Sequence, residues 1–206
     1  KKKQKSIKQI SEYILPEFIE PKPDLVQSNG IYLFGEFTIT DRDSKNISYL
    51  FSPKVKQLFL YILFKGIENG QGVNSQDIHS AIWPEKTPDN AKNLKGVILN
   101  LIRKILVDMD GIELTYKNGH FNLDITENCH IDFIHFIDEI DIITKTPNED
   151  NIDRLLKITS RGPFLKSIDF VPIIRIRHDI ARKIKLSLMP IITNCFKEHN
   201  YSSIIK

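Results

Sequence analysis

The sequence predicts an α+β unit, made of a small antiparallel sheet, three helices and a C-terminal hairpin, followed by an all-α region. Three patterns indicate this fold class. Short β-branched and aromatic runs separated by turn residues fill residues 30–51. Asn118-Gly119 lies between two alternating apolar runs, which is the strongest short signal for a hairpin. Beyond residue 130 the apolar residues recur at helical spacing.

The predicted sheet comes first along the chain. Apolar residues cluster at 31–34, 37–39 and 47–51, and Gly35 and the polar segment 41–46 lie between them. Runs of β-branched and aromatic residues that are bounded by turn residues are typical of short strands. We therefore expect three strands of a small antiparallel sheet before the first helix.

Two helices should follow the sheet. Residues 54–67 carry apolar residues at helical spacing, directly after Ser52-Pro53, which supplies a cap residue and a favoured first-turn proline. A brief strand is expected at Val73. Ser75 is then the expected N-cap of a second, short helix, which Pro84 ends.

The third helix and the hairpin complete this unit. Thr87 is the expected N-cap, Pro88 takes the first helical position, and the helix should extend to about Asp108. Strands at 112–116 and 120–123 then flank the Asn-Gly turn. A sheet, three helices and a hairpin, in this order, describe a winged helix, which we place at residues 30–125.

The remainder, residues 130–206, should be all helical. Apolar spacing predicts helices within 133–140, 152–158 and 173–189, with an extension or a kink of the last one at Pro190. We expect no strand beyond Asp124. Residues 201–206 resemble the start of another helix that the sequence does not complete.

Composition excludes several classes of protein. Of 206 residues, 41% are hydrophobic and 27% are charged, and no apolar run approaches the roughly 20 residues of a membrane helix. The net charge of +3 is too small to imply nucleic-acid binding by itself. Cys129 and Cys195 lie far apart in a chain without a secretory signal, so we expect reduced thiols and a cytoplasmic setting.

Residues 1–29 are interpreted as a basic segment and a linker. Lysines crowd the first eight positions and prolines follow, so we expect a short helix at 6–13 and then a proline-rich spacer. The lysines admit two interpretations. They form a solvated face, or they form a juxtamembrane segment after a membrane helix, since the chain begins with lysine and not methionine.

Several segments resemble parts of known regulators. Four of them are similar to the winged-helix domain of OmpR/PhoB-type proteins: Ile31-Tyr32-Leu33-Phe34-Gly35-Glu36-Phe37, Ser52-Pro53-Lys54, Ile82-Trp83-Pro84 and Ile102-Arg103-Lys104-Ile105-Leu106. Asp132-Phe133 and Arg161-Gly162-Pro163-Phe164-Leu165 are similar to the start and the inter-helix turn of the TPR-like activator domain in SARP-type regulators. The order of these matches is what makes the resemblance specific.

The resemblance implies a transcription regulator with a TPR-like, truncated helical domain at residues 130–206. Ala91-Lys92-Asn93 and Asp110-Gly111-Ile112-Glu113 further resemble Bacteroidetes-like versions, which often form the cytoplasmic end of membrane-anchored sensors. The implied partners are double-stranded DNA and, at the helical domain, a second copy or another protein. A membrane sensor attached through a preceding segment is a further implied partner.

DNA recognition by a helix needs polar side chains at base edges, with cations or amides at the phosphates. On a wheel of the third helix one side carries Lys92, Gly96, Asn100 and Arg103, and the opposite side carries Leu94, Ile98, Leu101 and Ile105. Lys92 and Arg103 would contact phosphate or guanine, and Asn100 adenine. Gly96 would allow close approach. The candidate set also includes Asn93, Lys95 and Lys104; the alternative is an ordinary solvated face.

The family alignment contradicts this wheel in one place. It makes Leu99, Ile102 and Leu106 the buried stripe and leaves Ile98 and Leu101 facing outward. Apolar side chains there would remove partners for base edges, although they can contact a thymine methyl group. An exposed apolar stripe also commonly marks an interface. A second hypothesis is therefore a protein-interaction module that keeps the winged-helix fold and has lost sequence-specific DNA binding.

Two further segments are candidates for contacts with the DNA backbone. Lys117, Asn118 and His120 near the hairpin tip are groups that follow phosphates or a minor groove, although Asn118-Gly119 is also simply good turn chemistry. Ser75 and Gln76 would bring the amide end of the second helix to a phosphate, or Ser75 would act only as a cap.

No enzyme, metal site or cofactor is predicted. Cys129-His130 with His135 lacks a second thiol pair at zinc-finger spacing. The acidic residues Asp132, Asp138, Glu139 and Asp141 are interpreted as a solvated helix face rather than as paired catalytic carboxylates. The glycines form no phosphate loop, and no Gly-x-Ser-x-Gly segment occurs.

Overall fold

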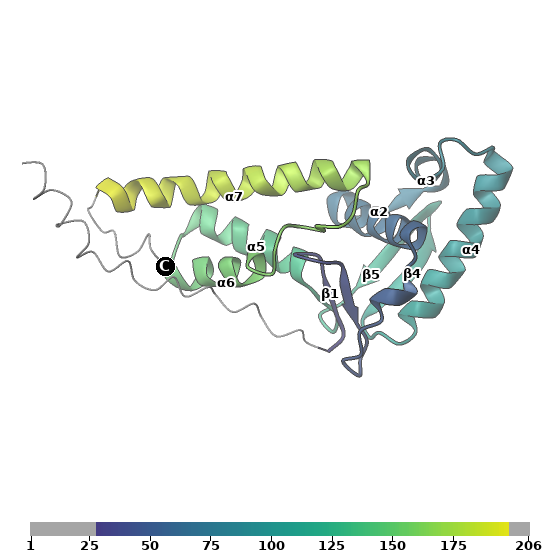
Figure 1. Cartoon of the computed structure of the whole chain (residues 1–206), viewed down its shortest axis with the longest axis horizontal. Helices are drawn as coiled ribbons and strands as arrows, with labels where there is room; N and C mark the ends of the chain where they lie inside the picture. Colours follow the sequence, from purple (N-terminus) through teal and green to yellow (C-terminus); the bar gives the residue numbers. More distant parts are fainter. Residues whose placement is uncertain (1–27, 198–206) are drawn as a thin grey trace, which may run out of the picture.

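The computed structural model describes residues 28–197, which form two small sheets and six α-helices (Figure 1). The strands are β1 (Gly30–Tyr32), β2 (Thr38–Thr40), β3 (Val73–Asn74), β4 (Ile112–Lys117), β5 (His120–Ile125) and β6 (His130–Ile131). The helices are the 3₁₀ turn η1 (Ser48–Leu50), α2 (Pro53–Asn69), α3 (Ser75–Ile82), α4 (Pro88–Leu106), α5 (Asp132–Lys145), α6 (Glu149–Thr159) and α7 (Val171–Lys197).

Each sheet gathers strands from distant parts of the chain. In the first sheet, β1 pairs antiparallel with β2 and parallel with β6. In the second, β5 pairs antiparallel with both β3 and β4. The β4–β5 hairpin was predicted and is confirmed. Its tight turn places Asn118 (φ 53°) and Gly119 (φ 82°) in the left-handed region, as an Asn-Gly turn requires.

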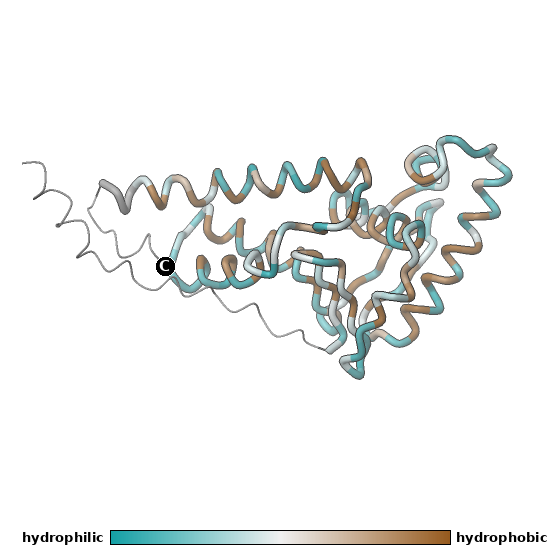
Figure 2. Tube along the Cα trace, viewed as in Figure 1, coloured by the Kyte–Doolittle hydropathy of each residue, from teal (hydrophilic) through white to brown (hydrophobic). Residues whose placement is uncertain are grey.

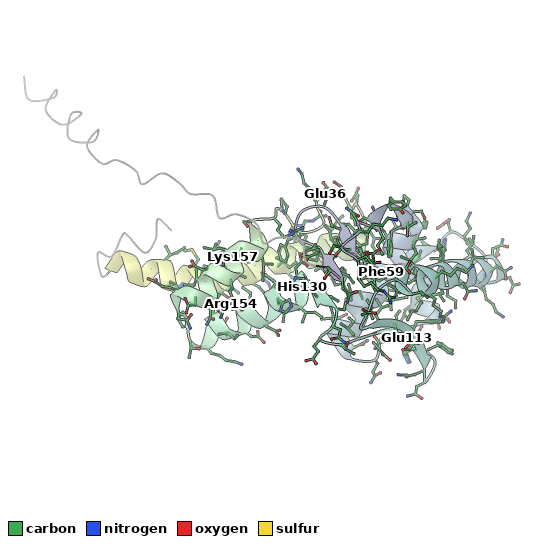
Figure 3. All side chains as sticks on the ribbon, turned by 90° about the horizontal axis from the view of Figure 1, so that it is seen from below. Glu36, Phe59, Glu113, His130, Arg154 and Lys157 are labelled. Atoms are coloured by element: carbon green, nitrogen blue, oxygen red, sulfur yellow. The ribbon has the colours of Figure 1, made fainter. Side chains whose placement is uncertain are left out.

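Helix α2 is the centre of the first unit. Its buried side chains cover most of the helix surface, and it packs against α3, α4 and β5. Phe59 is fully buried and meets Phe51 edge-on, with 5.2 Å between ring centroids. Figure 3 shows Phe59 deep among the side chains of this end of the molecule. Burial of this apolar surface holds α3, α4 and the hairpin against α2.

The prediction of a third strand at residues 47–51 is wrong. Residues 48–50 form the η1 turn, although the Ile47 N–H still donates to the Ile39 carbonyl (2.9 Å). The Ser48 hydroxyl accepts the Ile39 N–H (2.8 Å). A side chain therefore takes the hydrogen bond that a strand carbonyl would have accepted, and the backbone turns.

Helix ends agree with the predictions only in part. The N-cap of α3 is Asn74 and not Ser75, because the Asn74 side chain accepts the Asp77 N–H (2.9 Å). Helix α4 begins at Pro88, as predicted. It ends at Leu106, slightly before the expected position.

A strand follows the hairpin, contrary to the prediction that none would occur beyond Asp124. Strand β6 has two residues, too few to show an alternating pattern, and its strand character comes from parallel pairing with β1. The His130 N–H donates to the Asn29 carbonyl (3.1 Å). Asn29 is itself buried, and its side chain accepts the Asp110 N–H (2.8 Å). Asn29 therefore belongs to the fold and not to the predicted linker.

Asp132, the first residue of α5, is 2% exposed, so its predicted place on a solvated face is wrong. Its carboxylate accepts the N–H groups of Leu33 (2.8 Å) and Phe34 (3.0 Å), which follow β1. Burial raises the pKa of Asp132 to about 6, against the opposing effects of these N–H groups and of the Arg161 charge. The interaction fastens the start of α5 to the first sheet.

The turn after α6 makes a second connection to the same sheet. The Leu165 N–H donates to the Leu33 carbonyl (2.7 Å), and the Gly35 N–H donates to the Pro163 carbonyl (3.1 Å). Gly35 has φ 82°, and a Cβ there would lie 2.5 Å from the Arg161 carbonyl oxygen. Glycine permits this approach where other residues would clash. One hydrophobic cluster accordingly runs through both predicted units.

Helices α5, α6 and α7 confirm the three helices expected after residue 130. Helix α5 packs against α6, α7 and β1, and α7 continues through Pro190. No helix within residues 28–197 is long and apolar enough to cross a membrane. The helices expected at 6–13 and 201–206 lie outside the described residues. The TPR-like character of this region and the domain boundary at residues 125–130 stay predictions.

Replacing Asp132 by alanine should destabilise the protein. The Leu33 and Phe34 N–H groups would be left buried without acceptors, so we expect the free energy of unfolding to fall by roughly 2–4 kcal/mol. Denaturant unfolding followed by circular dichroism measures this change. The matched control is Asp138→Ala on the exposed side of the same helix, which should change stability by less than about 0.5 kcal/mol. Equal effects of the two substitutions would contradict the role of Asp132.

The pKa of Asp132 also predicts a pH effect on stability. The carboxyl is a weaker acid in the folded protein than its ordinary value of 3.8, so between about pH 4 and pH 6 the folded chain holds a proton that the unfolded chain has lost. This contribution is present below that window and is lost as pH rises through it. From acid to neutral pH, the native chain should lose up to about 3 kcal/mol relative to Asp132→Asn, which does not titrate. Parallel stability curves for the two proteins would refute the shift.

Candidate nucleic-acid interface

Helix α4 lies at the edge of the molecule, on the side away from α5, α6 and α7 (Figure 1). Its inner stripe consists of Ala91, Leu99, Ile102, Ile105 and Leu106, each at most 4% exposed. This stripe packs against α2, α3 and β4. Residues three and four apart lie on one side of a helix, so the opposite side of α4 is left to solvent.

The observed inner stripe decides between the helical wheel and the family alignment, which predicted different buried residues for this helix. The family alignment correctly buried residues 99, 102 and 106. The helical wheel is wrong for Leu94 (41% exposed) and Leu101 (39% exposed), which it placed on the inner side. Ile98, which the family alignment turned outward, is half-buried and packs against the core.

An apolar row, defined here as Leu94, Val97 and Leu101, crosses the outer face of α4. Val97 is 69% exposed and is the most open of the three. Figure 2 shows hydrophobic segments recurring along the length of this helix. Sequence reasoning missed Val97, although its position three residues after Leu94 and four before Leu101 was a usable signal.

Polar side chains border the apolar row. Asn93 and Asn100 are exposed and lie about two helical turns apart, on the same flank of the row. Arg103 Nη1 donates to Asn100 Oδ1 (3.1 Å), and Arg103 Nε donates to the Leu114 carbonyl of β4 (3.5 Å). Lys104 is exposed beyond the C-terminal end of the row. Lys92 is exposed on the other side of the helix, where it lines a hollow beside α3. The outer face therefore carries amides beside the row and one cation beyond its C-terminal end.

Lys95 points away from this outer face. Its ammonium group donates to the Ser75 hydroxyl (2.5 Å) and lies 5.3 Å from the centre of the Phe121 ring. Partial burial lowers the pKa of Lys95, and the charge of Lys92 lowers it further. The side chain thus packs α4 onto α3 and β5, which separates Lys95 from the other candidate residues of the helix.

Gly96 is not required by packing within the protein. A Cβ added at this position would meet no atom within 4 Å. Glycine in a helix interior destabilises it by roughly 0.5–1 kcal/mol relative to alanine. A glycine that weakens α4 and relieves no internal contact fits the close approach of an external partner.

The β4–β5 hairpin carries the remaining candidate residues. Lys117 pairs with Asp124 across the strands (2.7 Å), and this hydrogen bond raises the pKa of Lys117 and lowers that of Asp124. Both side chains are exposed, so the pair is weak and opens readily to another anion. His120 Nδ1 lies 3.0 Å from the Asn118 carbonyl. Tyr116, 56% exposed, is an aromatic side chain on this hairpin that sequence reasoning did not single out.

The start of α3 lies beside α4. Ser75, Gln76 and Lys92 line part of a hollow of about 540 Å³ between the two helices. The Ser75 hydroxyl already accepts a hydrogen bond from Lys95. Asp77 places a carboxylate in the first turn of α3, where it opposes a bound phosphate. A phosphate contact at Ser75 and Gln76 stays a prediction.

The other chemistry considered in the sequence lies outside this face. Cys129 is buried, and burial raises the pKa of its thiol to about 12. His130 and His135 stack with 4.6 Å between ring centroids, and no cluster of three metal-binding side chains occurs within residues 28–197. Glu139 is 13% exposed and pairs with Arg154 (2.6 Å), so it too departs from the predicted solvated face.

The fold resembles that of a protein of known structure. EmbR of Mycobacterium tuberculosis, solved in complex with a low affinity phosphopeptide, matches with a TM-score of 0.61 and 17% sequence identity. The match covers 84% of this chain and 51% of the EmbR chain, so this chain spans about half of EmbR. At this identity the likeness concerns the fold alone, and it is consistent with a winged-helix part followed by a helical part. Searches of protein-family models and of curated proteins give no match.

Gly96→Ala tests whether packing needs the glycine of α4. The new methyl group has open space and improves helix propensity, so the free energy of unfolding should rise by about 0.5–1 kcal/mol. Thermal unfolding measures this change. The control is Gly72→Ala, which should destabilise because Gly72 has φ 86° and lies against the Phe121 carbonyl. A loss of stability in Gly96→Ala would show that the protein interior requires this glycine.

Proposed function

We propose that this chain is a transcription regulator that inserts α4 into the major groove of double-stranded DNA. The observation that carries the proposal is the outer face of α4, a 19-residue helix that the core holds from behind and that exposes Asn93, Asn100 and Lys104. A helix with a diameter of about 10–12 Å fits the roughly 12 Å width of the groove. The fold presents this helix and leaves its outer face open.

The positions of the candidate residues on α4 suggest which part of the DNA each would contact. Lys92 and Lys104 would bind phosphates on either side of the groove, and Asn93 and Asn100 would reach base edges. Arg103 would bind a phosphate or a guanine after leaving the Leu114 carbonyl. Gly96 would allow the DNA to approach closely. Lys95 would act mainly by positioning α4 against α3.

The hairpin would contact DNA beside the groove that α4 occupies. Lys117, Asn118 and His120 lie at its tip, where an ammonium group, an amide and an imidazole suit phosphates or a minor groove. The weak pair between Lys117 and Asp124 would open when a phosphate replaces the carboxylate. These contacts would set the orientation of the protein and carry little sequence information.

The fold and the resemblance in the sequence support the same class of protein. EmbR is a SARP-family regulator with an OmpR-like winged-helix domain. On this basis α5, α6 and α7 would bind a second copy of the chain or another regulatory protein. The chain would act in the cytoplasm and catalyse no reaction, and its attachment to a membrane sensor stays a prediction.

A second candidate function is a protein-interaction module that uses the same face. The exposed row of Leu94, Val97 and Leu101 favours it, because an apolar stripe on a surface commonly marks an interface. This module would keep the fold and would lack sequence-specific DNA binding. Binding of the unmodified chain to duplex DNA at low salt separates the two candidates.

Lys104→Ala should weaken DNA binding and leave stability unchanged. The substitution removes one phosphate contact, so affinity should fall by a similar factor for all sequences, and the slope of log affinity against log salt should decrease by about 0.9. Fluorescence anisotropy with labelled duplex DNA over a range of salt concentrations measures both effects. The matched control is Lys157→Ala, an exposed lysine on α6 far from α4 (Figure 3).

Two results would count against the proposal. Failure of the unmodified chain to bind any duplex at low salt would exclude DNA binding and leave the protein-interaction module. Equal losses for Lys104→Ala and Lys157→Ala would remove α4 from the interface.

A further inference from the structure

We infer that α4 selects A·T base pairs by placing its apolar row against thymine methyl groups while its asparagines bind the paired adenines. This inference rests on the proposed DNA binding and names the class of site that the chain binds. It assigns Leu94, Val97 and Leu101 as the specificity-determining residues, with Asn93 and Asn100 as their polar partners.

The dimensions of the apolar row match a short run of base pairs. With a rise of about 1.5 Å per residue, Leu94 and Val97 lie about 4.5 Å apart along the helix, and Val97 and Leu101 about 6 Å. The row is therefore about 10 Å long, which lets it reach the edges of neighbouring base pairs along the groove. The major groove is where the C5-methyl of thymine projects, and it is the apolar group by which thymine is recognised there.

The asparagines beside the row favour the same base pair. An asparagine amide pairs with adenine by donating to N7 and accepting from the N6 amino group. Asn93 and Asn100 lie on one flank of Val97, and Leu94 and Leu101 lie on the other. The two flanks would thus contact opposite bases of one pair, adenine on one side and thymine on the other.

No cation of α4 lies within the apolar row itself. Lys104 follows the row on the exposed face, and Lys92 lies on the side of the helix that faces α3. Arg103 is held on Asn100 and on the Leu114 carbonyl, to one side of the row. Guanine recognition needs an Arg or Lys aimed at O6 and N7, and the middle of the outer face presents none. The charge pattern therefore suits a groove with cationic contacts at its edges and an apolar floor.

A protein partner would use this row differently. Protein interfaces are enriched in aromatic residues and arginine and depleted of lysine relative to the rest of the surface. The row instead has Lys104 beyond its C-terminal end and amides along one flank. These neighbours match phosphates and base edges, which is why we assign DNA as the occupant.

The test begins by selecting bound duplexes from a random pool with the whole chain. The selected sites should share a core of consecutive A·T pairs. Each thymine of that core is then replaced by deoxyuridine, which lacks only the methyl group. Each replacement should weaken binding about fourfold, the change expected for one buried methyl. Replacing thymines outside the core should change nothing.

A protein variant completes the test. Val97→Ala should abolish the difference between thymine and deoxyuridine at the central base pair and leave the fold intact, because Val97 is exposed. The matched control is Val107→Ala, which alters an equally exposed valine (69%) beyond the end of α4 and should retain full sensitivity to the methyl groups.

The outcomes separate this inference from the function on which it rests. Selected sites without thymine in the core, or sites that tolerate deoxyuridine, would overturn the inference and leave DNA binding standing. A Val97→Ala variant that weakens binding yet keeps full sensitivity to the methyl group would also overturn it. Failure to select any duplex would overturn both the inference and the proposed DNA binding.

Discussion

The buried carboxylate of Asp132 is the interaction on which the arrangement of this molecule depends. It accepts the N–H groups of Leu33 and Phe34 directly after β1, while β6, the strand just before Asp132, pairs with β1 itself. Without this acceptor two N–H groups would be buried unpaired, which costs more than most single interactions contribute. The turn at residues 163–166 adds a second set of bonds to the same segment. The helical end and the sheet therefore form one body, with α4 at its far edge (Figure 1).

The position of α4 follows from that body. Its inner stripe meets α2 and β4, and Lys95 fills the gap toward α3 with a bond to Ser75. The side opposite the inner stripe carries Asn93, Asn100 and Lys104, which are exposed. The apolar row lies between these polar residues and the inner stripe, and its three side chains are also open to solvent. These side chains suit a DNA groove that presents methyl groups, base edges and phosphates.

Much of the candidate interface was predictable from the sequence, because local spacing decides which residues share a helix face. Asn93, Asn100 and Lys104 were selected and are exposed. Lys95 was selected as well, yet it lies four residues before Leu99 and seven before Ile102, on the inner side of the helix, so its side chain points to Ser75 of α3. Val97 was overlooked, because helical periodicity alone does not show which of two overlapping apolar stripes is buried.

The sequence by itself determined the elements that short-range energies control: the helices with their proline starts and the Asn-Gly hairpin. Only the tertiary structure decided the strand at residues 130–131, the burial of Asp132 and the choice between the two inner sides that the sequence offered for α4. A two-residue strand exists only through its partner β1, and a carboxylate is buried only where backbone donors from a distant segment meet it. Such contacts join residues about a hundred positions apart, and no local pattern encodes them.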